Sequence, residues 1–245
     1  MSPEEFKNQF DILYNNISTN SAPGLDTYEI STYLTKAQLE IVKEYNGILN
    51  KYQKGFDAND KRRIDLKELI VDYKSTISII SNDRITNTLQ SKFFETPSNI
   101  FLIKYEKGIY LKGNCETEII IIPIALDEFN ESIKNPFKKP DNSLAWRLDY
   151  NSSVSNTVEI ISTKDITTYH LRYIKYPDPI ILTDLTTDPL FVGMNLSIDG
   201  QTNKQTCKLN QEIHPEILDR AVQLAIMDYK ENSLQNKVQL NNRNN

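Results

Sequence analysis

The stretch Leu209–Tyr229, LNQEIHPEILDRAVQLAIMDY, is where the sequence returns to a helical pattern after a long run of strand-like segments. Pro215 suits a first helical turn, where its missing N–H would have no partner in any case, and Asn210 or His214 can cap that turn. Apolar residues recur at steps of three and four, at Ile213, Ile217, Leu218, Ala221, Val222, Leu224 and Ala225. Because this stripe is broad, we expect a helix that buries two sides.

A second striped helix is predicted between Asp26 and Gln53. Asp26 with Glu29, and Thr35 with Gln38, form possible capping boxes, so this segment is one helix or two abutting ones. Its apolar stripe consists of Leu34, Ala37, Ile41, Tyr45, Ile48 and Tyr52. We expect this stripe to pack against the C-terminal helix.

Two shorter helices complete the predicted N-terminal part. One covers Pro3–Ile17, and the other follows Asp60 and buries Leu66, Leu69, Ile70 and Tyr73. The pattern between Ser75 and Ser98 is mixed and predicts no single element.

From Ile100 the apolar period changes to that of strands. IFLIKY, the turn EKG and IYLK predict a hairpin with Gly108 in the turn, and TEIIIIPIAL at 117–126 predicts a strand covered on both faces. Asp127 can cap a short helix that the segment NPFKKP ends. Further strands are predicted at Trp146–Tyr150, Val158–Ser162 and Thr168–Tyr176.

These patterns predict an α+β fold, in which an N-terminal helical bundle is closed by a C-terminal helix and an antiparallel β insertion lies between them. The expected divisions are an N-terminal helical part at 1–98, a β-rich insertion at 99–207, the C-terminal helix at 208–231 and a polar tail at 232–245. The tail alone cannot offset the entropy of ordering, so we expect another chain to hold it.

Composition narrows the function classes. The net charge of −5 argues against a general nucleic-acid-binding surface. The longest apolar run, Ile119–Leu126, is far shorter than the roughly 20 residues of a spanning helix, so we expect a soluble protein with no membrane partner. Cys115 and Cys207 have neither metal-site spacing nor a paired framework, which fits a reducing interior.

Residues 57–68 partly match the pattern of a calcium-binding loop. The ligand positions of such a loop are matched by Asp57, Asn59, Asp65 and Glu68. However, Lys61 replaces an oxygen ligand, Arg62 replaces the turn glycine, and Arg63 would add positive charge beside the ion. The alternative, a helix start capped by Asp57 or Asp60, fits better, so no metal site is predicted.

Catalytic patterns are missing from the sequence. His170 and His214 are its two histidines, and neither accompanies a GxSxG motif or a reactive-cysteine setting. Carboxylates are dispersed and glycines never cluster into a phosphate loop. We therefore expect no enzyme, no catalytic or cofactor-binding residues and no cofactor.

Three long stretches resemble a known family. They are Phe10–Val42 (FDILYNNISTNSAPGLDTYEISTYLTKAQLEIV), Ile122–Tyr150 (IPIALDEFNESIKNPFKKPDNSLAWRLDY) and His170–Ala225, with HLRYIKYPDPIILTDL and LNQEIHPEILDRAVQLA. Together they resemble structural virion proteins of crAss-like and related phages of Bacteroidetes, and among these the ring, or head-to-tail adaptor, proteins of the neck.

The resemblance implies a structural protein of the virion neck, between capsid and tail, assembled in the host bacterial cytoplasm. It implies a ring of about twelve copies that joins the portal protein to other neck and tail ring proteins and continues the DNA channel. DNA would contact the protein only by passing through the lumen. Proteins of this kind combine a helical bundle, a tail that grips the portal and a β region that meets the next ring.

Two hypotheses concern particular residues. Glu40 and Glu44 on the early helix are expected to face the lumen, because a basic lining would trap the phosphates of moving DNA. Leu234, Val238 and Leu240, the apolar residues of the tail, are expected to dock on the portal or on a neighbouring subunit.

Two other functions stay open at this point. A carbohydrate- or receptor-binding virion protein would display Trp146 and the tyrosines of the segment Ile100–Ile181 to a host glycan. A tail-associated hydrolase would need catalytic residues that the sequence does not offer.

Overall fold

The computed structural model describes residues 1–17, 24–45, 60–76, 78–79, 89–151 and 156–243. Their contacts group the chain into two compact units. Unit 1 combines Met1–Leu69 with Pro177–Asn245, and unit 2 is the continuous segment Ile70–Tyr176. Among the described residues, no helix is both long and apolar enough to cross a bilayer.

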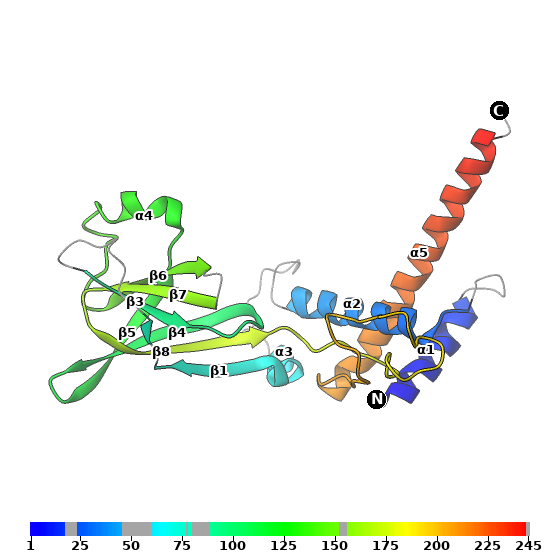
Figure 1. Cartoon of the computed structure of the whole chain (residues 1–245), viewed down its shortest axis with the longest axis horizontal. Helices are drawn as coiled ribbons and strands as arrows, with labels where there is room; N and C mark the ends of the chain where they lie inside the picture. The colour runs from blue at the N-terminus through cyan, green and yellow to red at the C-terminus, as the bar shows by residue number, and fades with distance from the viewer. Residues whose placement is uncertain (18–23, 46–59, 77, 80–88, 152–155, 244–245) are drawn as a thin grey trace. The chain divides into compact units, whose positions relative to one another are not determined.

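Unit 2 is built on one eight-stranded sheet with the order β1-β8-β4-β5-β6-β7-β3-β2 (Figure 1). Neighbouring strands run antiparallel except β5 and β6, which run parallel. The strands are β1 (Ile70–Ser75), β2 (Ser78–Ile79), β3 (Gln90–Glu95), β4 (Ile100–Lys112), β5 (Cys115–Pro123), β6 (Leu144–Asn151), β7 (Asn156–Ser162) and β8 (Ile166–Lys175).

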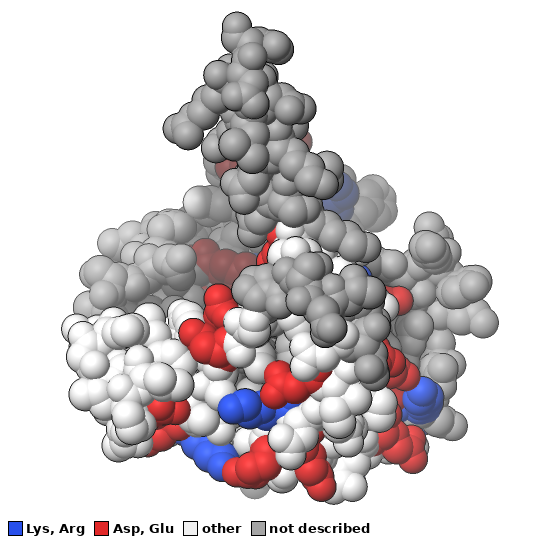
Figure 2. All heavy atoms as spheres, turned by 90° about the vertical axis from the view of Figure 1, so that its right-hand side faces the viewer, with Lys and Arg blue, Asp and Glu red and all other residues white. Residues whose placement is uncertain are grey.

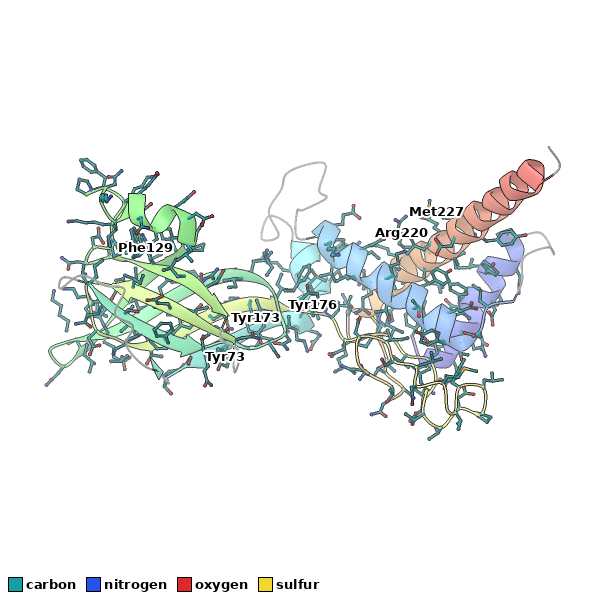
Figure 3. All side chains as sticks on the ribbon, turned by 45° about the horizontal axis from the view of Figure 1, so that its top comes forward. Tyr73, Phe129, Tyr173, Tyr176, Arg220 and Met227 are labelled. Atoms are coloured by element: carbon teal, nitrogen blue, oxygen red, sulfur yellow. The ribbon has the colours of Figure 1, made fainter. Side chains whose placement is uncertain are left out.

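Helix α4 (Leu126–Ser132) lies in the connection between the two parallel strands. A parallel pair needs such a crossover, since a tight turn cannot return the chain to the same end of the sheet. Phe129 of α4, labelled in Figure 3, packs edge-on against Trp146 with ring centroids 6.0 Å apart. This contact holds the helix on the sheet. Phe129 and Trp146 form a small buried apolar cluster with Leu148 and Ile161.

A larger apolar cluster fills the rest of the sheet core. Its members come from six strands. The partly buried Tyr73 of β1, labelled in Figure 3, packs against this cluster and lies opposite Leu171 of β8. The buried residues are Phe94, Tyr110, Ile119, Ile121, Ala145, Val158, Ile160, Ile166, Tyr169, Leu171 and Tyr173.

A buried ion pair lies within this sheet. Arg147 Nη1 of β6 is 2.7 Å from Glu106 Oε2 of β4, and both side chains are less than a tenth exposed. Tyr169 donates its hydroxyl hydrogen bond to Glu106, and burial, followed by the charge of Glu106, raises the pKa of Tyr169. Asp149 supplies a second, exposed carboxylate 3.0 Å from Arg147 Nε.

Unit 1 contains three longer helices: α1 (Pro3–Ile17), α2 (Thr27–Tyr45) and α5 (His214–Arg243). The short α3 (Asp60–Asp65) and the 3-10 turns η2 (Lys67–Leu69) and η3 (Gln211–Ile213) complete its described regular structure. Helix α5 packs on both α2 and α1. Figure 1 shows the C-terminal half of α5 projecting away from α1 and α2.

One side of α2 is covered by an irregular segment, residues 177–210, rather than by a helix. Ser31 Oγ accepts from Leu182 N at 3.1 Å, Thr35 Oγ1 accepts from Ile180 N at 3.1 Å, and Gln38 Nε2 donates to Asp178 O at 3.0 Å. These side chains satisfy backbone groups that the irregular segment would otherwise bury without partners.

The predicted N-terminal helical bundle is therefore wrong. The sheet dominates the fold, and α2 packs mainly against α5 and an irregular segment, with only a minor contact to α1. The helix expected after Asp60 ends at Asp65, and Ile70 and Tyr73 lie in β1, which pairs with β8. Pairing with β8 satisfies the backbone of this segment, which alternates between covered and exposed residues as a strand does. The β region is also mixed rather than purely antiparallel, because β5 pairs in parallel with β6.

The hairpin predicted around Gly108 is also wrong. Strand β4 continues through this glycine to Lys112, and the turn to β5 comes at Gly113, whose φ is +65°. A Cβ on Gly108 would lie 3.0 Å from Ile119 Cγ2 and 3.1 Å from Ile166 Cδ1. Gly108 therefore makes room for two core side chains instead of turning the chain.

Candidate functional site in the groove between α2 and α5

A groove of about 600 Å³ lies between α2 and α5 of unit 1. Helix α2 contributes Glu40, Ile41, Glu44 and Tyr45, and α5 contributes Glu216, Asp219, Arg220 and Gln223. Four carboxylates thus share the lining with one guanidinium group. On the molecular face drawn in Figure 2, acidic side chains are spread widely, with few basic ones among them.

Direct polar contacts hold the two walls of the groove together. Arg220 Nε of α5, labelled in Figure 3, donates to Glu40 Oε2 of α2 at 2.7 Å. Tyr45 donates its hydroxyl hydrogen bond to Glu216 Oε2 at 3.1 Å. Because the Arg220 and Glu40 side chains are about one third exposed, solvent screens their ion pair, and it fixes position more than it adds stability.

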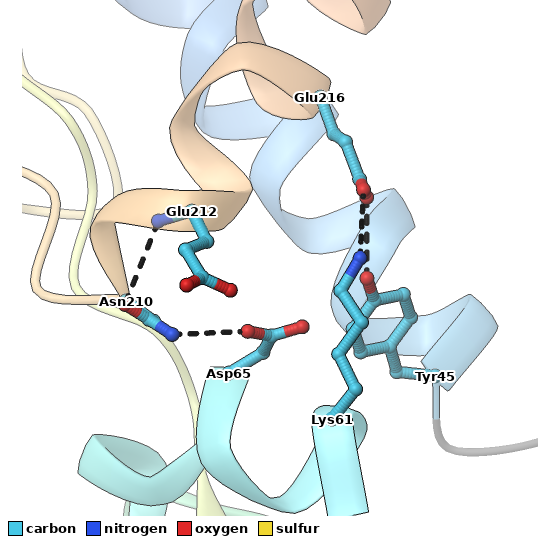
Figure 4. A network of polar contacts seen from close by, with 6 residues as sticks. All are labelled: Tyr45, Lys61, Asp65, Asn210, Glu212 and Glu216. Carbon is cyan, nitrogen blue, oxygen red and sulfur yellow. Dashed lines mark hydrogen bonds and ion pairs between the residues drawn. The ribbon is translucent and has the colours of Figure 1, made fainter. Parts of the chain in front are cut away.

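The start of the C-terminal helical segment is fixed by a further network, drawn in Figure 4. Asn210 accepts from the backbone N–H of Glu212, so of the two predicted caps, Asn210 and His214, it is Asn210 that caps the turn η3. Its side-chain amide donates to Asp65 Oδ1 at 3.1 Å. Lys61 Nζ reaches Glu216 Oε1 at 3.5 Å, so α3 is tied to the same end of the groove.

His214 is buried at the beginning of α5. Its Nδ1 lies 2.7 Å from the α-amino group of Met1, and its Nε2 lies 3.0 Å from Leu209 O. A neutral ring satisfies both contacts when Nε2–H donates to the carbonyl and Nδ1 accepts from the ammonium group. Burial, and then the charge of that ammonium group, lower the pKa of His214, so the ring is neutral at pH 7.

The structure brings both lumen candidates into the groove. Glu44 is exposed there, whereas Glu40 is paired with Arg220. The tail candidates Leu234, Val238 and Leu240 belong to the backbone of α5, but their side chains lie outside the described residues.

Residues considered for other chemistry lie elsewhere. Of the calcium-loop pattern, Asp57 and Asn59 are outside the described residues, and Asp65 is engaged by Asn210. His170 lies on β8 within the sheet, as expected. Trp146, the main support for a glycan-binding platform, is 1% exposed beneath α4. It is therefore not available to stack against a sugar.

Sequence reasoning missed several exposed features. Arg220 joins the two walls of the groove through Glu40, a contact that the helical pattern alone does not predict. The segment NPFKKP follows the end of α4 at Ser132, as predicted, and the exposure of its Phe137 was not foreseen. The sequence pattern that could have indicated this exposure is an aromatic residue beside lysines, between two prolines, in a segment without the apolar periodicity of a helix or strand.

The chemistry of the groove is that of a charged surface. Among the described residues, its lining contains no histidine, cysteine or serine, so no side-chain nucleophile with a neighbouring base is brought together there. Carboxylates with one paired arginine can attract cationic groups and repel phosphates. The groove is thus a charged surface between two helices, and its one arginine is already paired with Glu40.

Comparison with known proteins gives the particular family. The family model described as phage tail ring protein 3/4 matches residues 1–237. The chain is 41% identical over 246 residues to "Ring protein 4/5" of Bacteroides phage crAss001, covering 99% of each chain. It is 34% identical over 233 residues to "Ring protein 3" of the same phage, covering 93% of this chain and 96% of that protein. The chain belongs to the phage tail ring protein 3/4 family, and the resemblance to ring proteins of crAss-like phages is confirmed.

Proposed function

We propose that this protein is a structural component of the virion that closes into a ring in the phage neck, joins the portal protein to the next tail ring and continues the DNA channel. The observation that carries the proposal is the similarity over nearly the whole chain to two proteins named as ring proteins. The ring would contain about twelve copies. It would assemble in the cytoplasm of the host bacterium.

The α2–α5 groove fits a position beside the channel. Glu44 and the other carboxylates would repel the phosphates of passing DNA, and Arg220 would stay neutralised by Glu40. Replacing Glu44 with lysine should leave ring formation intact and slow DNA release from assembled virions, with Glu44→Gln giving a smaller delay. Release at the normal rate from Glu44→Lys virions would contradict the lumen assignment.

The projecting end of α5 fits a role in docking. We propose that Leu234, Val238 and Leu240 pack on the portal or on a neighbouring subunit. Deleting residues 232–245 should leave a folded monomer that no longer joins the neck, because only the outer end of α5 is removed. Incorporation of the truncated chain at the normal level would refute this docking role.

Negative-stain imaging tests the proposed function as a whole. The chain is mixed with the portal protein of its phage, and portal alone serves as the control. We expect an additional ring of density on one end of the portal. Unchanged portal particles, with the chain left in the unbound fraction, would contradict the proposal.

A further inference from the structure

A basic loop in unit 2 exposes one large aromatic side chain. The lysine loop, residues 134–139 (KNPFKK), connects α4 to β6 and contains no acidic residue. Phe137 is 96% exposed, and Lys134, Lys138 and Lys139 are exposed around it. No ion pair among the described residues uses these three ammonium groups. An aromatic residue beside cationic groups is the composition that protein interfaces favour.

The backbone of the lysine loop is fixed by local hydrogen bonds. Phe137 N donates to Asn135 Oδ1 at 3.0 Å, and Lys138 N and Lys139 N both donate to Asn135 O at 3.1 Å. Asn135 N in turn donates to Ser132 O at the end of α4. Phe137 is thus held outward on an ordered frame, which lowers the entropy lost on binding.

An acidic loop in unit 1 has the opposite character. The acidic loop, residues 184–202, contains Asp184, Asp188 and Asp199 and no lysine or arginine. It exposes three apolar side chains at alternate positions: Leu190 is 66%, Val192 60% and Met194 62% exposed. Beside them lies a hollow of about 290 Å³, lined in part by Leu185, Phe191 and Leu196.

The acidic loop is also held in a defined shape. Phe191 is buried in an apolar cluster with Ile181, Leu185 and Ile198. Asp188 Oδ1 accepts from Leu190 N at 3.0 Å, and Leu185 N donates to Thr202 O at 2.9 Å. Hydrogen bonds from Thr186 lower the pKa of Asp184, so its carboxylate is charged at neutral pH.

We propose that the lysine loop of one copy docks on the acidic loop of a second copy of this chain, with Phe137 against Leu190, Val192 and Met194. A ring closed by rotation is built from heterologous contacts, so each subunit must carry two different, complementary patches. The two loops match in charge, and each exposes apolar area that a contact would bury. This inference rests on the proposed ring, and it names the surfaces by which neighbouring copies meet.

Crosslinking of two cysteine variants tests the pairing directly. The natural exposed cysteine is removed as Cys115→Ser, and Phe137→Cys and Met194→Cys are then made in separate full-length chains. Each variant alone and their equimolar mixture are first assembled with the portal protein of the phage, and a short bismaleimide is then added. We expect the mixture to give several-fold more covalent dimer than either variant alone, because only the mixture places a cysteine on both sides of one contact.

A matched control uses another exposed apolar position. Ile12→Cys on α1, 59% exposed, replaces Met194→Cys in the mixture and should give no more dimer than the single variants. Adding Lys138→Glu and Lys139→Glu to the Phe137→Cys chain, or raising the salt concentration, should lower the yield several-fold.

The outcomes separate this inference from the proposed function. If the mixture gives no more dimer than the Ile12→Cys control, the loop pairing is wrong. If rings still form on the portal in that case, the proposed function stands and only the assignment of the contact fails. Absence of both crosslinks and rings would overturn both.

Discussion

The two units of this chain reach a buried core by different routes. Unit 2 is one continuous segment whose sheet joins many strands that are close in sequence, such as the β4–β5 hairpin and the β6–β7 pair. Unit 1 brings residues from both ends of the chain together, because α2 packs against α5, which lies far from it in the sequence. Unit 2 should therefore fold independently, whereas the two halves of unit 1 should depend on each other.

The largest expected effect comes from separating the segments. Residues 70–176 expressed alone should give the circular dichroism of a β protein and a cooperative thermal transition. Residues 1–69 alone should be mostly unfolded, because α1 and α2 lose the surface of α5 and the segment 177–210. A folded 1–69 fragment, or an unfolded 70–176 fragment, would break the comparison.

A substitution in the buried ion pair should destabilise unit 2 strongly. Arg147→Ala leaves Glu106 buried without its cation, at a cost of about 3–5 kcal/mol. Asp149→Ala, which removes the exposed partner of the same arginine, is the matched control and should have a small effect. Urea denaturation of the 70–176 fragment measures both. Equal effects for the two variants would mean that the buried pair is not a central contact of the sheet.

Filling the space at Gly108 should have a moderate effect. A methyl group there meets Ile119 and Ile166, and overpacking of this kind costs about 1–3 kcal/mol. Gly24→Ala is the control, since no heavy atom lies within 4 Å of its added Cβ. Thermal denaturation of the full chain should show a lower midpoint for Gly108→Ala alone. A stabilised Gly108→Ala variant would contradict the close packing of β4 on β5 and β8.

The smallest expected effect is a pH dependence of unit 1. Because the pKa of His214 is lowered in the folded chain, the unfolded chain binds a proton more readily. The stability contributed by the neutral ring is therefore complete above the ordinary histidine pKa of about 6.5 and is lost as pH falls below it. The charged group that contacts the His214 ring is the Met1 ammonium. The other neighbours of the ring are the Leu209 carbonyl and the Phe6 ring, which carry no charge.

Hydrogen exchange at pH 7.5 and 5.5 can locate this effect. Protection in α1 and the first turns of α5 should fall at the lower pH, and His214→Gln should reduce the difference. His170 in unit 2 also has a lowered pKa, caused first by burial and then by Lys107, so the variant is needed to assign the change. Unchanged pH dependence in His214→Gln would exclude the ring as its source.

Local patterns predicted the helix caps and the three strands β6, β7 and β8, which lie close to their expected positions. The caps at Asp26 and Asn210 have local causes, and both are present: Asp26 Oδ1 accepts from Glu29 N at 2.7 Å, and Asn210 caps the turn before α5. The mistakes occurred where a distant partner decides the structure. Ile70 and Tyr73 suit either a helix or a strand, and pairing with β8 selects the strand.

The candidate site was predicted only in part. Glu40 and Glu44 were chosen for their charge on a helix, and the groove does contain them, but the pairing of Glu40 with Arg220 depends on how two distant helices align. The exposed apolar loops could not be found from periodicity, since neither belongs to a helix or strand. Gly108 was misplaced because a glycine that fits a turn equally fits a crowded core.

If copies of this chain close into a ring on the portal, as we propose, the mass of the portal complex must rise by that number of chains. One chain has a mass of 28.3 kDa. Native mass spectrometry of the purified chain, alone and mixed with the portal protein of its phage, should show a monomer that becomes a portal complex heavier by a single whole number of chains. A chain that stays at its monomer mass beside an intact portal would contradict the account.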